Sequence, residues 1–529
     1  MTQLGLIAAV IFATAVLIPL ASRVNLPWPV LVTMFGIVLA AIPQVPQIHV
    51  EPDLILPLVL PPLLYATARK TSWRLWASHA RPILLLAVAL VLLTSALVAF
   101  VAAHAVPGIT VAGAVALGAL VSPPDPVAAT AIASKLSLPR RLVSTLEGEG
   151  LFNDVAALVL YQVAIGAVVG GSFSAGGAAL KLLLAAVLAL VVGFCFGWTI
   201  SRLAAWLSTS DPRPAVLISV LAPTAVYVAA EEVHGSGVLA VLVYTLYSVS
   251  RPVDAGDAQG RLTTDVFWSM TETLVTGVAF GLVGLEFQTA FEAIGQRWTQ
   301  LVGETAAVVG VVVGIRLAYL LPSVLLFRGA DVPIGWRETV VVWWAGMRGV
   351  ATVALALAIP LTVDGGGPFP ARDRILFIAF AVVLVTLVLQ GMTLPSLVRM
   401  LGVQAGPGDE DAAEGALIER AADAAAEALN RLQQQEKFNV EVWDRLNAFP
   451  TDLLARLSAQ LGEANQHAVA PRRDENREQF RAGLQRMLLA ARAELLAARS
   501  ERGVEPDLVD DLVRRLDLYS LPGPTGPPH

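Results

Sequence analysis

Residues 109–134 read ITVAGAVALGALVSPPDPVAATAIAS, an apolar stretch interrupted in its middle by Ser122-Pro123-Pro124-Asp125-Pro126. A helix needs about 20 mostly apolar residues to cross a bilayer, and this stretch is long enough. Each proline removes a backbone donor and clashes with the preceding turn, so this run of prolines cannot continue a helix. We expect a helix broken at mid-membrane. A tolerated kink is the alternative, but a kink has no need of the carboxylate of Asp125.

The composition around this stretch is that of a membrane protein with a different C-terminal part. Of 529 residues, 56% are hydrophobic and 15% charged, whereas average soluble domains carry roughly 25% charged residues. Residues 1–402 hold 21 Lys and Arg against 20 Asp and Glu, and residues 403–529 hold 15 against 22, so the net charge changes from +1 to −7. We predict a transmembrane domain over 1–402 and an acidic, α-helical cytoplasmic tail over 403–529.

Apolar segments predict an all-α polytopic membrane protein with about thirteen transmembrane helices. The expected spans lie near 4–21, 27–43, 54–68, 82–104, 109–134, 142–170, 179–206, 214–232, 236–250, 263–288, 299–327, 338–361 and 375–401. Alternate connections hold 15 Lys and Arg on one side and 4 on the other. Because cytoplasmic loops are enriched in these residues, the N-terminus is expected outside and the tail inside.

Four charged residues fall deep inside these spans, where charge is expensive and usually functional. They are Asp125, Glu149, Asp154 and Arg348. At the helical rise, Asp125, Asp154 and Arg348 lie ~15–20 Å from the basic residues at their cytoplasmic ends. Three separate segments therefore place charge near the middle of the bilayer. Broken helices at that depth form the ion sites of transporters.

The two deep carboxylates of the segment Glu147-Gly148-Glu149-Gly150-Leu151-Phe152-Asn153-Asp154 need different partners. Asp154 and Glu149 point roughly 140° apart on a helix. Asp154 lies one turn above Gly150, which leaves an open groove for an ion or a neighbouring helix. Glu149 needs a fixed counter-charge, and we expect Arg348 to supply it, since an unpaired buried guanidinium is untenable. Arg316 is expected to meet either a helix-break carbonyl or a carboxylate such as Glu272.

Three motifs together resemble the monovalent cation/proton antiporters of family 1, the sodium/proton exchangers. They are Glu-Gly-Glu-Gly-Leu-Phe-Asn-Asp at 147–154, Asp-Pro-Val-Ala at 125–128 and Trp-Ala-Gly-Met-Arg-Gly at 344–349. The resemblance covers about residues 5–400 and leaves the tail uncovered. It implies inverted repeats, two broken helices that cross, and a homodimer.

The resemblance also implies roles for single residues. Asp154 would bind the cation and the proton, with Asn153 beside it, and Asp154 and Asp125 would be the carboxylates that hold Na+. Asn153 stands where the electrogenic branch usually has an aspartate, which implies electroneutral exchange. Gly150 belongs to the ion site, and Glu149 pairs with Arg348.

Three positions depart from the family pattern, and they leave the choice of ion open. Gly150 replaces a frequent serine, Pro124 replaces a frequent threonine, and Ala66 stands where many members have an acidic residue. We expect water or main-chain carbonyls to substitute for the missing ligands.

These observations predict a secondary active antiporter, not an enzyme, that exchanges a monovalent cation, Na+, for H+ by alternating access. K+/H+ exchange and a cation channel are the alternatives. No phosphate-binding glycine motif or nucleophile–base pair is evident, so no cofactor is expected, and no nucleic acid is expected as a partner. The alanine- and arginine-rich composition suggests a bacterial inner membrane, and the resemblance implies a role in pH homeostasis.

Overall fold

The computed structural model describes most of the chain as helices. The described residues are 3–24, 26–43, 45, 51–69, 73–125, 138–171, 175–207, 213–249, 258–294, 298–326, 335–403, 409–435, 439–458, 474–499, 501, 504 and 506–520. Within these ranges the only departure from helices and loops is an isolated β-bridge between Thr362 and Pro368. The predicted all-α class is confirmed.

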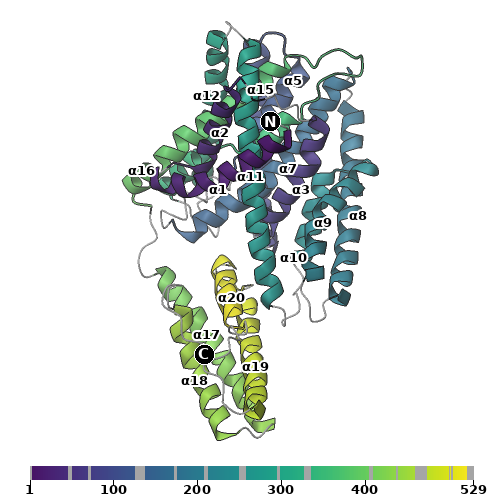
Figure 1. Cartoon of the computed structure of the whole chain (residues 1–529). Coiled ribbons are helices and arrows are strands. Elements are labelled where there is room, and N and C mark those ends of the chain that lie inside the picture. The colour runs from purple at the N-terminus through teal and green to yellow at the C-terminus, as the bar shows by residue number, and fades with distance from the viewer. Residues whose placement is uncertain are drawn as a thin grey trace. The chain divides into compact units, whose positions relative to one another are not determined.

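The helices of the predicted membrane domain follow the expected spans closely (Figure 1). They are α1 (Gln3–Val24), α2 (Trp28–Ala40), α3 (Pro52–Ala68), α4 (Trp73–Ala105), α5 (Val111–Val121), α7 (Arg140–Val169), α8 (Ala175–Leu207), α9 (Arg213–Glu232), α10 (Gly237–Val249), α11 (Ala258–Ile294), α12 (Trp298–Leu326), α13 (Trp336–Trp344), α14 (Val350–Leu357), α15 (Arg372–Val385) and α16 (Gly391–Leu401). Among the described residues, 6 segments are helical, long and apolar enough to cross a membrane. The number of thirteen crossings stays a prediction.

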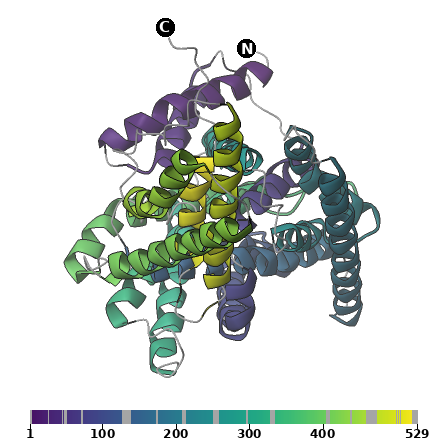
Figure 2. The ribbon, with the colours of Figure 1, turned by 90° about the horizontal axis from the view of Figure 1, so that it is seen from below.

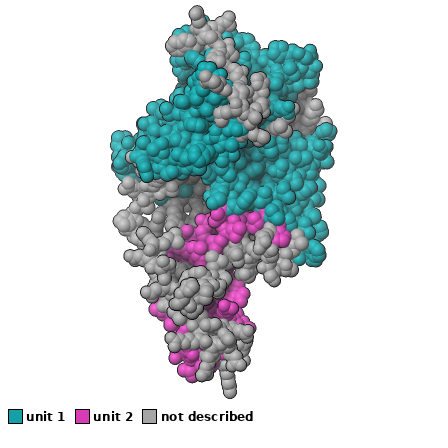
Figure 3. Space-filling view, in the orientation of Figure 1, with its two compact units in different colours: residues 1–206, 217–251, 267–404 teal, residues 207–216, 252–266, 405–529 magenta. Residues whose placement is uncertain are grey.

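The chain divides into two compact units, which Figure 3 colours separately. Unit 1 comprises residues 1–206, 217–251 and 267–404, and unit 2 comprises 207–216, 252–266 and 405–529. Unit 1 contains one large apolar core. On the outside of unit 1, α8 exposes large apolar side chains such as Leu183, Leu190 and Phe194. This outward apolar face suits contact with lipid, as expected for a polytopic membrane protein.

Glycines allow close helix contacts at two places where small residues recur. A Cβ at Gly281 would overlap Val10 of α1, and a Cβ at Gly193 would overlap the carbonyl of Ala240 in α10. Small residues at helix contacts let backbones approach closely in lipid. Gly193 and Gly281 each belong to a pair of glycines four residues apart, and Gly310 forms such a pair with Gly314. Nevertheless, no described atom of a neighbouring element lies within 4 Å of the Cβ position of Gly310. Spacing alone therefore does not identify a contact face.

Two of the expected spans in unit 1 contain a non-helical stretch, which we call a break, and the two breaks contact each other. Helix α5 ends at Val121, as the proline-rich sequence predicts, and the chain is non-helical up to Asp125; the remainder of the expected span, 126–134, lies outside the described residues. The expected span at 338–361 is likewise split into α13 and α14, with non-helical chain between Trp344 and Val350. The main-chain N–H of Asp125 donates to the carbonyl of Met347 at 2.6 Å, which joins the two breaks directly.

The predicted tail contains four helices, seen from below in Figure 2. They are α17 (Asp409–Gln435), α18 (Val440–Ser458), α19 (Asp474–Ala498) and α20 (Pro506–Ser520). Their apolar faces form a second core that is separate from the core of unit 1 and includes Leu446, Met487 and Leu512. These three side chains are completely buried. The helices expected from the periodic apolar residues of the tail are therefore amphipathic helices that cover one another.

Candidate functional site

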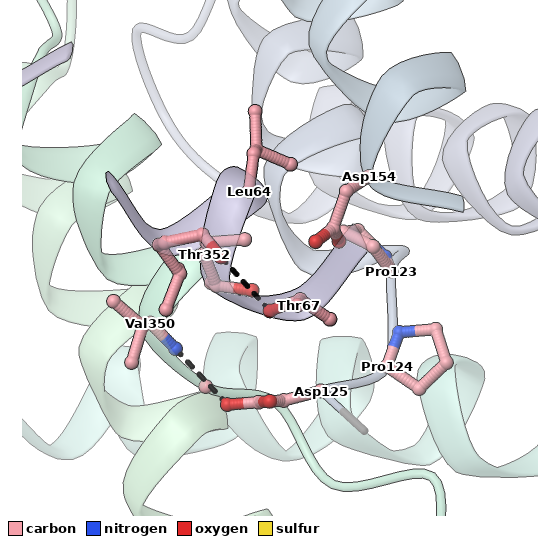
Figure 4. Close-up of a pocket in the computed structure, with 11 residues that line it drawn as sticks. Leu64, Thr67, Pro123, Pro124, Asp125, Asp154, Val350 and Thr352 are labelled. Atoms are coloured by element: carbon pink, nitrogen blue, oxygen red, sulfur yellow. Dashed lines mark hydrogen bonds between the residues drawn. The ribbon is translucent and has the colours of Figure 1, made fainter. Parts of the chain in front are cut away.

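A small cavity lies where the two helix breaks meet α3 and α7 (Figure 4). Its volume is about 20 Å³, enough for about one water or one dehydrated ion. Two carboxylates and two hydroxyls contribute to its lining. The lining residues are Leu63, Leu64, Thr67, Pro123, Pro124, Asp125, Asp154, Gly349, Val350, Ala351 and Thr352. The structure thus brings together Asp125 and Asp154, which the sequence placed on two different spans at similar depth.

Asp125 is held by the main chain of the second break. Its carboxylate Oδ2 accepts a hydrogen bond from the N–H of Val350 at 3.2 Å, the contact dashed in Figure 4. Val350 is the first residue of α14, where N–H groups lack helical acceptors and the helix dipole favours a negative charge. Gly349 lies directly against this carboxylate, and a Cβ there would overlap the Asp125 side chain. The glycine that follows Arg348 is therefore required by this close approach.

Arg348 is completely buried and binds carbonyls at the C-terminal ends of two half-helices. Its Nε donates to the carbonyl of Val121 at 2.9 Å and its Nη2 to that of Ser122 at 3.1 Å, while Nη1 donates to the carbonyl of Gly346. These carbonyls end α5 and α13, and such ends lack helical donors and carry partial negative charge. Arg348 thereby supplies hydrogen-bond donors and a positive charge to the C-terminal ends of both α5 and α13. Its own N–H donates to Thr386 Oγ1 at 3.1 Å.

The prediction that Glu149 pairs with Arg348 is wrong, because Glu149 pairs with Arg316 of α12. Arg316 donates from Nη1 to Oε1 at 2.5 Å and from Nη2 to Oε2 at 2.8 Å. This two-pronged geometry is the strongest common arrangement between arginine and a carboxylate. Gly346 makes room for it, since a Cβ there would overlap the Arg316 side chain. Because the guanidinium of Arg348 is bonded to carbonyls, Arg316 supplies the counter-charge of Glu149.

Two other predicted site residues lie away from the cavity lining. Asn153 is completely buried, and its Nδ2 donates to Glu149 Oε1 at 3.4 Å. It therefore extends the Glu149–Arg316 pair. Gly150 is also buried, and neither it nor Asn153 is among the described residues that line the cavity. In this conformation the groove expected beside Gly150 is not part of the carboxylate cavity.

Two threonines that line the cavity were not predicted from the sequence. Thr67 follows Ala66 on α3, and its hydroxyl donates to the carbonyl of Leu63 at 2.9 Å. Thr352 lies in the first turn of α14 and is also among the residues that line the cavity. The available signal was a hydroxyl residue next to Ala66 and another three positions after the motif at 344–349. That signal is weak, because threonine is common in apolar helices.

Comparison with known proteins identifies the family of this chain. Residues 10–400 match the family described as sodium/hydrogen exchanger, transmembrane, so the chain belongs to this family of transporters. It is 32% identical over 407 residues to an uncharacterized Na+/H+ exchanger of Mycobacterium tuberculosis, a match that covers 75% of this chain and 73% of the relative. It is 31% identical over 395 residues to the sodium, potassium, lithium and rubidium/H+ antiporter of Bacillus pumilus, covering 70% of this chain and 58% of that protein.

A solved structure shares the fold. The sodium proton antiporter MjNhaP1 of Methanocaldococcus jannaschii matches with a TM-score of 0.60 at 17% identity, covering 75% of this chain and 98% of that chain. The expected membrane-antiporter architecture is thereby confirmed for the larger part of the chain.

Proposed function

We propose that this protein is a secondary antiporter that exchanges Na+ for H+ at Asp154, one for one and by alternating access. The observation that carries the proposal is the shared cavity of Asp154 and Asp125 at the contact of two helix breaks. A deprotonated carboxylate attracts a hard cation through its oxygens, and a protonated one does not. Because proton and cation compete for one carboxylate, their fluxes are coupled without ATP.

The surrounding contacts give the carboxylates Asp125, Glu149 and Asp154 different roles. Asp125 is engaged by the N–H of Val350, and Glu149 is engaged by Arg316. Both carboxylates are therefore held in place, which leaves Asp154 to exchange its proton. Asn153 supports Glu149 as a neutral group. One exchanging carboxylate is consistent with electroneutral transport.

The choice of Na+ over K+ rests on the names of the relatives. The relatives are named as Na+/H+ exchangers, although the relative in Bacillus pumilus is named for potassium, lithium and rubidium as well. K+/H+ exchange therefore stays the second candidate. We further propose a homodimer in a bacterial plasma membrane, with the N-terminus outside, that serves pH homeostasis.

The test is proton flux in proteoliposomes with an imposed pH gradient, to which Na+, Li+, K+ or choline is added. Na+ should collapse the gradient with the wild-type protein and fail to do so with Asp154→Asn, while Asp364→Asn in an exposed loop should behave as wild type. Proton flux should saturate with the cation concentration and should require a gradient of the counter-ion. A channel would show neither property. Full exchange by a folded Asp154→Asn protein would refute the mechanism. The rate at which each cation collapses the pH gradient decides whether Na+ or K+ is the preferred ion.

A further inference from the structure

The Thr352 hydroxyl is buried at the cavity without a hydrogen-bond partner among the described residues. Thr352 is 1% exposed, and its Oγ1 lacks a partner although the residue lines the cavity with Asp154. A buried hydroxyl without a partner costs free energy, so native proteins rarely keep one. Threonine in a helix usually bonds a carbonyl of the preceding turn, as Thr67 does with Leu63. The Thr352 hydroxyl is instead available to something that enters the cavity.

We propose that Thr352 Oγ1 is a direct ligand of the transported cation and sets the affinity of the site for it. This inference rests on the proposed antiport and adds a ligand to its site. A hydroxyl oxygen has two lone pairs, and oxygen is the donor that hard cations prefer. With Thr352 on α14, Asp125 after α5 and Asp154 on α7, residues with side-chain oxygens from three segments line one cavity.

The sequence explains why this hydroxyl matters here. Of the three positions that depart from the family pattern, only Pro124 lines the cavity, and its side chain carries no oxygen. Thr67 faces the same cavity, and because its proton is directed to the Leu63 carbonyl, its lone pairs also remain available. Threonines from α3 and α14 are thereby the neutral side chains at the cavity that carry a hydroxyl.

The role of Thr352 differs for the two transported ions. A proton on Asp154 forms a covalent O–H bond and needs no further ligand, whereas a dehydrated cation needs several oxygens. Loss of the hydroxyl should therefore weaken cation binding and leave proton binding in place. At a fixed Na+ concentration the proton would then compete more successfully, so transport would require a higher pH.

The test compares Thr352→Val, which keeps the side-chain shape and removes the oxygen, with Thr352→Ser, which keeps the oxygen. In proteoliposomes, Thr352→Val should raise the KM for Na+ by about tenfold to a hundredfold, the loss expected for one contact to a charged partner. The maximal rate at saturating Na+ should stay at the wild-type level. Thr352→Ser should restore the KM. Thr33→Val removes a buried hydroxyl that bonds Pro29 outside the cavity, and it should leave the KM unchanged.

The outcomes separate this inference from the proposed function. Na+-dependent flux with a wild-type KM in Thr352→Val would overturn the ligand role and leave antiport intact. A loss of maximal rate with an unchanged KM would also overturn it, because it would indicate a structural role. Absence of Na+-dependent flux in the wild type would overturn both. If valine at 352 prevents folding, Thr352→Ala is measured in the same way and its KM decides.

Discussion

The Glu149–Arg316 pair makes a specific prediction about stability. Both residues lie inside the membrane domain, and Arg316 is only 2% exposed while the Glu149 side chain is 13% exposed. Replacing Arg316 with methionine keeps much of the volume and leaves the Glu149 carboxylate buried without its counter-charge. Breaking a buried pair from one side costs roughly 3–5 kcal/mol. We therefore expect Arg316→Met to lower the melting temperature in detergent strongly.

The double variant tests the cause of that loss. Removing both charges, in Arg316→Met with Glu149→Gln, should recover most of the stability, because replacing a whole buried pair is often nearly neutral. Arg348→Met serves as the comparison. It should destabilise by leaving the carbonyls of Val121 and Ser122 without donors, and adding Glu149→Gln should not rescue it.

Thermal unfolding followed by size-exclusion chromatography is measured for six proteins: the wild type, the single variants Arg316→Met, Arg348→Met and Glu149→Gln, and the two double variants. A double-mutant cycle then gives the coupling of Glu149 to each arginine. Strong coupling to Arg348 and none to Arg316 would refute the pairing seen in the structure and restore the pairing expected from the sequence. A wild-type melting temperature for Arg316→Met would show that the pair contributes little.

Two further predictions concern other parts of the molecule. Gly349→Ala should abolish transport, because the added methyl would displace the Asp125 carboxylate, whereas Gly310→Ala, with no described neighbour, should retain it in the same flux assay. In the tail, hydrogen bonds from Arg420 lower the pKa of Glu501, so this contact stabilises above the unfolded pKa of about 4.3 and is lost as pH falls through the folded value. Hydrogen exchange of α17 in the full chain should therefore quicken in acid, after correction for intrinsic rates, and Arg420→Met should show much of that effect at pH 7. An unchanged exchange pattern in Arg420→Met would contradict this.

Much of the fold could be predicted because lipid imposes simple rules on sequence. The length of apolar runs located the helices, and the prolines around Asp125 located the end of α5. The depth of Asp125 and Asp154 within their spans anticipated that they share one site. These features depend on one segment at a time, so a single sequence carries them.

The partner of Glu149 could not be predicted, because it depends on which helices are neighbours. The helical repeat gives the direction in which Glu149 leaves its own helix, but not whether α12 or the second break lies there. Both Arg316 and Arg348 were possible partners of Glu149. Arg348 bonds the carbonyls at the ends of α5 and α13 instead, which leaves Arg316 as the partner. The Thr352 hydroxyl was missed for the same reason, since its lack of a partner is visible only when its surroundings are known.

The hydrogen bond from Asp125 N–H to the Met347 carbonyl uses only main-chain atoms. Apart from proline at 125, which would remove the donor N–H, no side-chain replacement can delete this bond directly, so the two breaks can stay joined while the side chains around them change over evolution. Selectivity and scaffold are thereby separable in this protein. One oxygen ligand can be exchanged for another on a different helix while the main-chain bond between the two breaks stays in place. Thr67 and Thr352, on α3 and α14, are examples of hydroxyls at such positions. The same separation makes this cavity a practical place to engineer a preference among Li+, Na+ and K+.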